Sequence, residues 1–170
     1  TRCGTLFPYT TLFRSGVRVA ADRAEAERLW QARKAVSPAL FAYGPDKINE
    51  DIVVPRSRIP EMIRKIQAIG RETGLVTAGF GHAGDGNIHV NIMLDKSDPA
   101  QLHQAEAAIA DLFDYTVALG GTISGEHGIG TTKAAYLPTE FGPVAIDLMK
   151  KIKTLFDPNG ILNPGKIFPE

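Results

Sequence analysis

Residues 75–94 constrain the fold most, because they combine two extended stretches with a turn rich in glycine. Apolar side chains occupy every second position from Ile88 to Leu94, which places His89 and Asn91 together on the opposite face. Residues 75–81 form the other extended stretch, and Ala-Gly-Asp-Gly-Asn at positions 83–87 is typical of a tight turn. We therefore predict a β-hairpin with one face in the core and an imidazole beside an amide on the other.

Apolar residues at helical spacing predict four helices around this hairpin, near residues 22–42, 57–74, 98–119 and 142–156. Pro38 should interrupt the first helix, and Asp98-Pro99 supplies an N-cap followed by proline at N1 for the third. A short strand is expected at residues 52–54, before Pro55. The pattern predicts an α+β fold, a largely antiparallel sheet with helices packed on one side. The last helix is expected to bury a stripe of Ala145, Leu148, Met149, Ile152 and Leu155.

The composition fits one soluble globular domain of 170 residues. Nineteen basic and nineteen acidic residues cancel, so the charge gives no indication of a nucleic-acid partner. No apolar run approaches the ~20 residues that a membrane-spanning helix needs. We expect a cytoplasmic protein, with peripheral association with a membrane as the alternative.

The first fifteen residues are set apart from the fold prediction. Residues 5–15, Thr-Leu-Phe-Pro-Tyr-Thr-Thr-Leu-Phe-Arg-Ser, resemble translated sequencing-adapter sequence and lack the order of regions in a signal peptide. Cys3, the sole cysteine, lies in this stretch, so the chain has no disulfide framework. We expect residues 1–15 to be non-native, residues 16–170 to form the domain, and the natural protein to extend upstream of Gly16.

Histidine and glutamate side chains gather in two glycine-rich segments, residues 79–91 and 120–130. His82, His89 and Glu126 together provide two imidazoles and a carboxylate, the ligand set of an open catalytic zinc site. Histidines that only make structural hydrogen bonds near a turn are the alternative. Two histidines that flank a glycine-rich turn, together with a Glu-His pair among glycines elsewhere, favour a functional site. Of the two kinds of functional site, a metal site is favoured over one that only forms hydrogen bonds.

Adjacent residues of an extended chain point apart, so His127 cannot easily share the ligand role of Glu126. It is therefore a candidate acid or base. A role in orienting the site is its alternative. Residues 79–84 match the pattern G-x-G-x-x-G, but a strand follows where a dinucleotide-binding site needs a helix, so we reject that interpretation. From spacing alone, Arg33 and Lys47 belong to solvated basic surface.

The two glycine-rich segments and Phe-Asp-Pro-Asn-Gly-Ile-Leu-Asn-Pro-Gly-Lys at positions 156–166 resemble a known family. They are similar to the C-terminal domain of FAD-linked oxidases of the vanillyl-alcohol-oxidase type. The similarity is strongest to the branch with glycolate oxidase flavin subunits, D-lactate dehydrogenases and D-2-hydroxyglutarate dehydrogenases, and it runs from about Glu25 to the end of the chain. It implies a ferredoxin-like topology and an enzyme whose FAD is bound mainly by a separate N-terminal domain.

The resemblance also implies roles for individual residues. His82, His89 and Glu126 match the ligands of a divalent metal, and His127 matches the general base. Contacts to a small 2-hydroxyacid are implied for Asn91, Arg33, Ser37 and Lys47; Ser37 stands where the family member compared has threonine, and the Lys47 match requires a gap. Asn163 lies in a tail that is expected to face the flavin, and separate electron-acceptor subunits are expected partners.

Two other functional classes remain open at this point. Two histidines and a glutamate with an open coordination position would also suit a zinc-dependent hydrolase. A non-catalytic remnant is the second alternative, because the expected FAD-binding segment is absent from these 170 residues.

Overall fold

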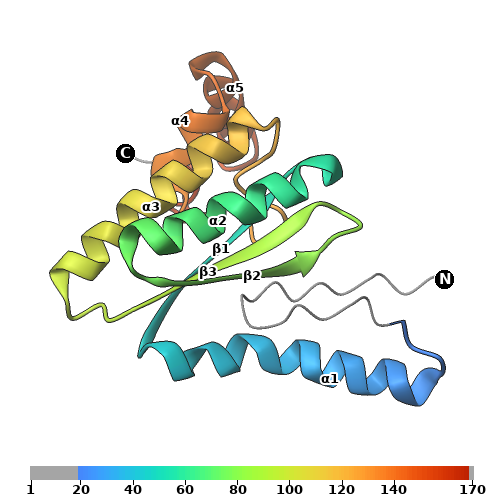
Figure 1. Cartoon of the computed structure of the whole chain (residues 1–170). Helices are drawn as coiled ribbons and strands as arrows, with labels where there is room; N and C mark the ends of the chain where they lie inside the picture. Colours follow the sequence, from blue (N-terminus) through green and yellow to red (C-terminus); the bar gives the residue numbers. More distant parts are fainter. Residues whose placement is uncertain (1–18, 169–170) are drawn as a thin grey trace.

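The computed structural model describes residues 19–168, so the predictions for residues 1–15, including Cys3, and for Gly16 lie outside the described part. Three antiparallel strands form one sheet in the order β1-β3-β2 (Figure 1). They are β1 (Asp46–Val53), β2 (Val76–His82) and β3 (Asn87–Leu94). The predicted hairpin of β2 and β3 is confirmed, and Gly86 in its turn takes a left-handed φ of 76°.

Two helices, α2 (Ile59–Thr73) and α3 (Pro99–Ala118), cover one face of the sheet (Figure 1). The apolar positions of β3 point to this side and pack with Met62, Leu112 and Phe113, which are fully buried. The side chain of Asp98 accepts hydrogen bonds from two backbone N–H groups in the first turn of α3, which confirms it as the N-cap. This layer is the main core of the described residues.

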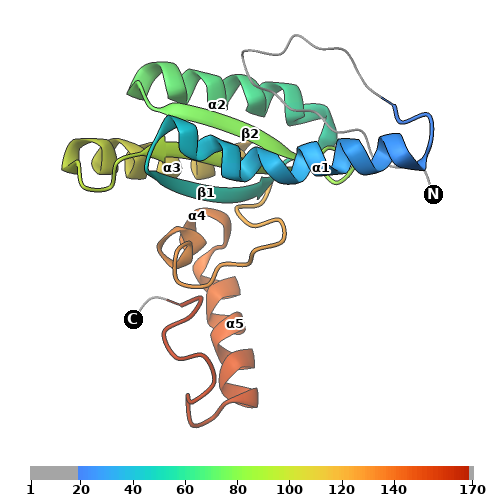
Figure 2. The ribbon, with the colours of Figure 1, turned by 90° about the horizontal axis from the view of Figure 1, so that it is seen from below.

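Helix α1 (Arg23–Ala39) crosses the opposite face of the sheet and is the exception to the prediction that the helices lie on one side (Figures 1 and 2). Its apolar contacts with the sheet are few: Val36 of α1 and Leu40, which follows the helix, pack on Phe80 and Met93. Pro38 does not interrupt α1, which continues through it and ends one residue later, before a 3-10 turn at Leu40–Tyr43. Because α1 covers only part of this face, polar side chains of β1, β2 and β3 are left facing the loops.

The element order matches a β-α-β-β-α unit, β1-α2-β2-β3-α3. After α3 the chain returns beside β1, where Val53 and Thr122 form an isolated antiparallel bridge. A ferredoxin-like fold has its fourth strand at this edge, so the order is compatible with that topology. The bridge also brings the segment that contains Glu126 to the edge of β1.

Helices α4 (Leu137–Glu140) and α5 (Pro143–Phe156) follow, and α5 extends away from the sheet (Figure 2). The prediction that α5 buries an apolar stripe is wrong within the described residues. Ala145 and Met149 are half-buried, whereas Leu148, Ile152 and Leu155 are between 50% and 77% exposed. The helical spacing identified an apolar face correctly, but no described element covers that face. Of the helices described for residues 19–168, none is long and apolar enough to cross a membrane.

Candidate metal centre

The face of the sheet opposite α2 and α3 carries the candidate site. Asp51 of β1, His89 of β3 and Phe80 of β2 lie directly opposite one another in the strand register. Residues that face each other across antiparallel strands point to the same side of the sheet. Asp51, His89 and Phe80 therefore form one row, and His82 lies two residues beyond Phe80 on the same face.

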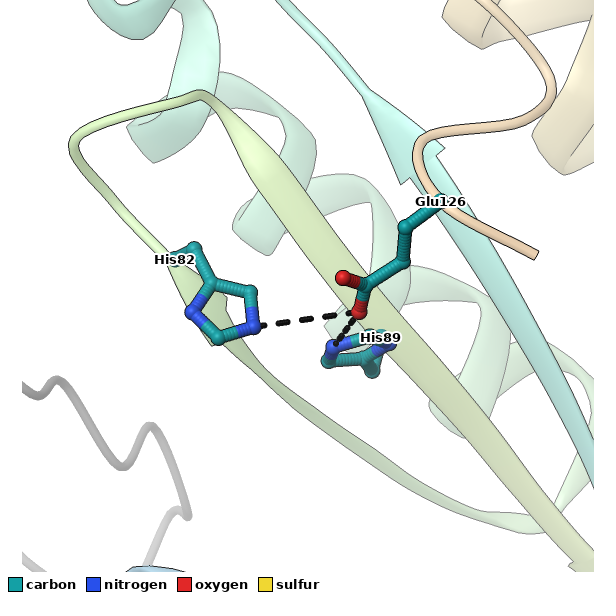
Figure 3. Close-up of side chains that lie close together, drawn as sticks. All are labelled: His82, His89 and Glu126. Atoms are coloured by element: carbon teal, nitrogen blue, oxygen red, sulfur yellow. Dashed lines mark ion pairs between the residues drawn. The ribbon is translucent and has the colours of Figure 1, made fainter.

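His82, His89 and Glu126 converge at the end of this row (Figure 3). Oε1 of Glu126 lies 3.1 Å from Nε2 of His89 and 3.8 Å from Nε2 of His82. The three potential ligand atoms are all within 4.8 Å of one another, and the two imidazole rings meet edge to face. The structure thus brings together three residues that the sequence places in two separate segments.

The three side chains differ in exposure, which leaves the cluster open on one side. His89 is buried, with 8% of its side chain exposed, whereas His82 and Glu126 are about half exposed. Burial is the main reason that the pKa of His89 lies below its usual value, and the nearby Glu126 carboxylate opposes this shift. A lowered pKa favours the neutral imidazole, the form whose lone pair can bind a metal.

Glu126 comes from a loop that is attached to β1 through Asp51. The Asp51 carboxylate accepts hydrogen bonds from the backbone N–H groups of Gly125, Glu126 and His127, with distances of 2.7 Å to Gly125 and 3.1 Å to His127. Its side chain is completely buried. The strand therefore determines where the loop presents Glu126.

Lys133 supplies the positive charge beside Asp51. Its Nζ donates to Oδ1 of Asp51 at 2.7 Å and to two backbone carbonyls, of Asp51 and Ile123. Burial of Asp51 opposes ionisation, but the hydrogen bonds from Lys133 and the loop outweigh it and lower the pKa of Asp51 to about 2. On the other side of Lys133, burial raises the pKa of Glu50. The hydrogen bonds around Asp51 thus favour its ionised form.

Gly125 is required by the close approach of the loop to the sheet. A Cβ at this position would lie 1.9 Å from Nδ2 of Asn87 and 3.0 Å from Oδ2 of Asp51. Both neighbours are buried and belong to strands, so neither can move away easily. The absence of a side chain at position 125 allows the loop to reach the carboxylate.

His127 lies next to the cluster without being part of it. Its ring stacks on that of His89, with centroids 5.5 Å apart and an interplanar angle of 26°. Nδ1 of His127 is 3.4 Å from Oδ1 of Asp51, and about half of the His127 side chain is exposed. Both side chains contact His89, but Glu126 does so through its carboxylate and His127 through its ring, and only His127 also lies beside the Asp51 carboxylate.

The residues implied as substrate contacts do not all reach the cluster. The guanidinium of Arg33 lies over the Phe80 ring, 4.4 Å from its centroid, and that ring lies against His89. Lys47 donates to Ser37 at 2.6 Å. Lys47 is four residues from Asp51 along β1, a distance of about 13 Å at the rise of a strand. Arg33 is therefore beside the cluster, and the Lys47–Ser37 pair is farther along the same face.

Asn91 and Asn163 differ from their predicted settings in the site. Asn91 is completely buried; its Nδ2 donates to the backbone oxygen of His89, and its Oδ1 has no partner among the described residues. It lies two residues from His89 on the same face of β3. Asn163 is exposed, with a φ of 48°, in the tail that follows α5. That tail contacts the site loop farther on, where Ile167 donates to the backbone oxygen of Gly130.

Asp51 and Lys133 were not predicted from the sequence as residues of the site. Asp51 immediately precedes the apolar run 52–54, and a charged residue at the edge of a predicted strand was the available signal. Lys133 has no comparable signal, because an isolated lysine in a loop is usually solvated.

Comparison with known proteins identifies the family of this chain. The family model "FAD linked oxidases, C-terminal domain" matches residues 10–167. Glycolate oxidase subunit GlcD of Bacillus subtilis (strain 168) is 42% identical over 89% of this chain and 32% of its own length. The mitochondrial D-lactate dehydrogenase [cytochrome] of Arabidopsis thaliana is 38% identical over 88% of this chain and 27% of its own length.

Another relative is D-2-hydroxyglutarate dehydrogenase of Stutzerimonas stutzeri (strain A1501), 38% identical over 85% of this chain and 32% of its own length. The chain thus spans between 27% and 32% of these three relatives. Among solved structures, 4-ethylphenol oxidase from Gulosibacter chungangensis, in an isoeugenol complex, aligns with a TM-score of 0.57 and 21% identity. That alignment covers 89% of this chain and 32% of the oxidase, and it supports the fold. The family match covers nearly all of the sequence, and the chain belongs to the FAD-linked oxidases as their C-terminal domain.

Proposed function

We propose that residues 16–170 are the substrate-binding and catalytic part of an FAD-dependent 2-hydroxyacid oxidoreductase. The proposal depends chiefly on the convergence of His82, His89 and Glu126 beside His127. Three relatives, a glycolate oxidase subunit, a D-lactate dehydrogenase and a D-2-hydroxyglutarate dehydrogenase, indicate small 2-hydroxyacids as the substrate class. The FAD would be bound mainly by a separate domain, and the flavin would supply the two-electron acceptor.

The donor set fits a divalent cation, and zinc best. Two imidazole nitrogens and one carboxylate oxygen within 4.8 Å match a three-ligand site with an open position. When bound, such a cation supplies Lewis acidity that makes a substrate hydroxyl more acidic. Because His82 and Glu126 are partly exposed, a substrate could reach the open coordination position of the cation.

His127 would accept the proton of the substrate 2-hydroxyl while the Cα–H bond breaks and its electron pair passes to the flavin as hydride. The product is the 2-oxoacid, so one proton and one hydride leave the substrate. His127 suits this role because it is half exposed and adjacent to His89, yet is not one of the three converging groups. A general base must reach the proton that it removes, and this position provides that reach.

The guanidinium of Arg33 would bind a substrate carboxylate, since it lies on Phe80 at the edge of the cluster. Lys47 and Ser37 would contact the far end of a longer acid. Asn91 would contact the substrate only after a movement that exposes Oδ1, because its side chain is completely buried and this atom has no partner among the described residues. Asn163 would contribute to the surface of the tail that faces the flavin.

The test uses the protein extended upstream to include its FAD-binding domain. We expect D-lactate, glycolate or D-2-hydroxyglutarate to bleach the flavin absorbance anaerobically. His89→Ala should lose metal and flavin reduction together, since it removes one of three ligands. His127→Ala should retain metal and slow reduction by ~10²–10⁴, the usual cost of removing a general base.

Two results would contradict the proposal. Equal loss of metal in His127→Ala and His89→Ala would reverse the roles assigned to His127 and Glu126. Hydrolytic activity with no flavin reduction by any 2-hydroxyacid would favour the zinc-dependent hydrolase instead.

A further inference from the structure

Asp51 contacts both loop residues that the proposed function uses, Glu126 and His127. Its carboxylate accepts from three consecutive backbone N–H groups, those of residues 125–127, which include Glu126 and His127. The same carboxylate lies 3.4 Å from Nδ1 of the His127 side chain. One buried acidic group therefore touches the metal-ligating segment and the candidate base at once.

The position of this carboxylate is itself restrained on several sides. Asp51 is paired directly opposite His89 within the strand register, so its backbone moves with the sheet that carries two of the ligands. Lys133, which is 2% exposed, binds Oδ1 and also the backbone oxygens of Asp51 and Ile123. Strand, lysine and loop are thereby joined in one set of hydrogen bonds, in which those of Lys133 are buried and those of the loop are partly buried.

The contact between Asp51 and His127 has a consequence for the imidazole. A carboxylate beside Nδ1 favours the tautomer with the proton on Nδ1, because only that form donates toward it. Nε2 then keeps its lone pair. This is the nitrogen that a base needs free, by the same logic as an aspartate that orients the histidine of a catalytic triad.

We propose that Asp51 is the positioning residue of the site, which presents Glu126 to the metal and sets the tautomer of His127. The inference rests on the proposed function, because it takes the roles of Glu126 and His127 from there. It adds a residue that itself touches neither the metal nor the substrate and acts through the loop.

The chain contains a matched control for this role. Asp157 is also buried, pairs with Lys153 and accepts hydrogen bonds from two backbone N–H groups, those of Ile161 and Leu162. These partners belong to α5 and the tail and include no member of the cluster. Removing the charge of Asp157 therefore disturbs a similar arrangement without touching the loop of residues 125–127.

The first experiment is a Co²⁺ titration of the 170-residue chain, followed by the visible d–d absorbance. We expect Asp51→Asn to weaken Co²⁺ binding by ~10–100-fold, the usual effect of removing a group that orients a ligand. Asp157→Asn should bind Co²⁺ as the wild type does. The double variant Asp51→Asn with Lys133→Met removes both buried charges, so it tests the proposal even if the single variant does not fold.

The second measurement is the ¹⁵N NMR signature of His127 in the metal-free chain, assigned with His127→Gln. The wild type should show the Nδ1–H tautomer, and the double variant should lose this preference while Asp157→Asn keeps it. Unchanged Co²⁺ affinity together with an unchanged tautomer in the double variant would overturn the inference.

Neither measurement involves flavin or a hydroxyacid, so its outcome is separable from that of the proposed function. A longer protein that fails to oxidise any 2-hydroxyacid would reject the proposed activity while the Asp51 effects persist. A wild-type chain that fails to bind Co²⁺ would reject both the metal site and the presentation of Glu126 to it.

Discussion

Ionised Asp51 should stabilise this domain at neutral pH and lose that effect in acid. Comparison of the wild type with Asp51→Asn measures this contribution to the free energy of unfolding. The pKa of its carboxyl falls from 3.8 to about 2 on folding, although burial alone would raise it. A group with a depressed pKa in the folded state contributes stability above its unfolded pKa and loses that contribution as the pH falls through its folded pKa. The loss should therefore occur between about pH 5 and pH 2.

The size of the effect follows from the shift. One pKa unit corresponds to about 1.4 kcal/mol, so the difference between 3.8 and about 2 is worth roughly 2.5 kcal/mol at neutral pH. Most of it, roughly 2 kcal/mol, should disappear by pH 2. Other carboxyl groups titrate in the same range, but they are common to the wild type and Asp51→Asn and cancel in the difference between the two.

The assay is urea unfolding of both proteins at pH 5 and pH 2, without metal, followed by circular dichroism. The wild-type free energy of unfolding, relative to that of Asp51→Asn, should fall by roughly 2 kcal/mol between the two pH values. A difference that is the same at both pH values would refute the reasoning, since it would mean that the pKa of Asp51 is not depressed by Lys133 and the loop.

Other predictions concern the loop, the substrate contacts and the need for a second domain. Gly125→Ala should destabilise the domain by ~1–3 kcal/mol, because its Cβ overlaps Asn87, whereas Gly84→Ala, with no atom within 4 Å of its Cβ, should be nearly neutral in urea unfolding. In the extended protein, Arg33→Lys should raise KM for every 2-hydroxyacid, since an ammonium cannot form a bidentate fork; Lys47→Met should raise it for 2-hydroxyglutarate and leave it unchanged for glycolate. The 170-residue chain alone should be colourless; a preparation with stoichiometric flavin that dithionite bleaches would contradict this.

The hairpin and the α2–α3 layer could be predicted because their residues follow simple periods. Alternation from Ile88 to Leu94 fixed which side of β3 enters the core, and this placed His89 on the site face. The early part of β1 was missed. Residues 46–51 are mostly polar, since one face of β1 carries the site and the other carries Glu50 beside Lys133. The strand that holds Asp51 therefore lacks the apolar pattern by which strands are recognised.

The three residues of the cluster, His82, His89 and Glu126, could be named from residue types, but their convergence could not be deduced from spacing. Glu126 approaches His89 through the hydrogen bonds between residues 125–127 and Asp51, a contact across about 75 positions of the sequence. The prediction that α5 buries its apolar stripe was wrong for a different reason. Helical periodicity shows that Leu148 and Ile152 share a face of α5. It does not show which other segment packs against that face.

The hairpin of β2 and β3 also determines the order in which the cluster can assemble and come apart. His82 and His89 become neighbours as soon as these adjacent strands pair, an event of about 1–10 μs for a hairpin. Glu126 joins only after β1 has paired with β3 and the loop has reached Asp51. In reverse, detachment of residues 125–127 alone removes the carboxylate and leaves both imidazoles on an intact sheet. For the divalent metal proposed above, the rate of exchange should therefore follow local opening of this loop and not global unfolding of the domain.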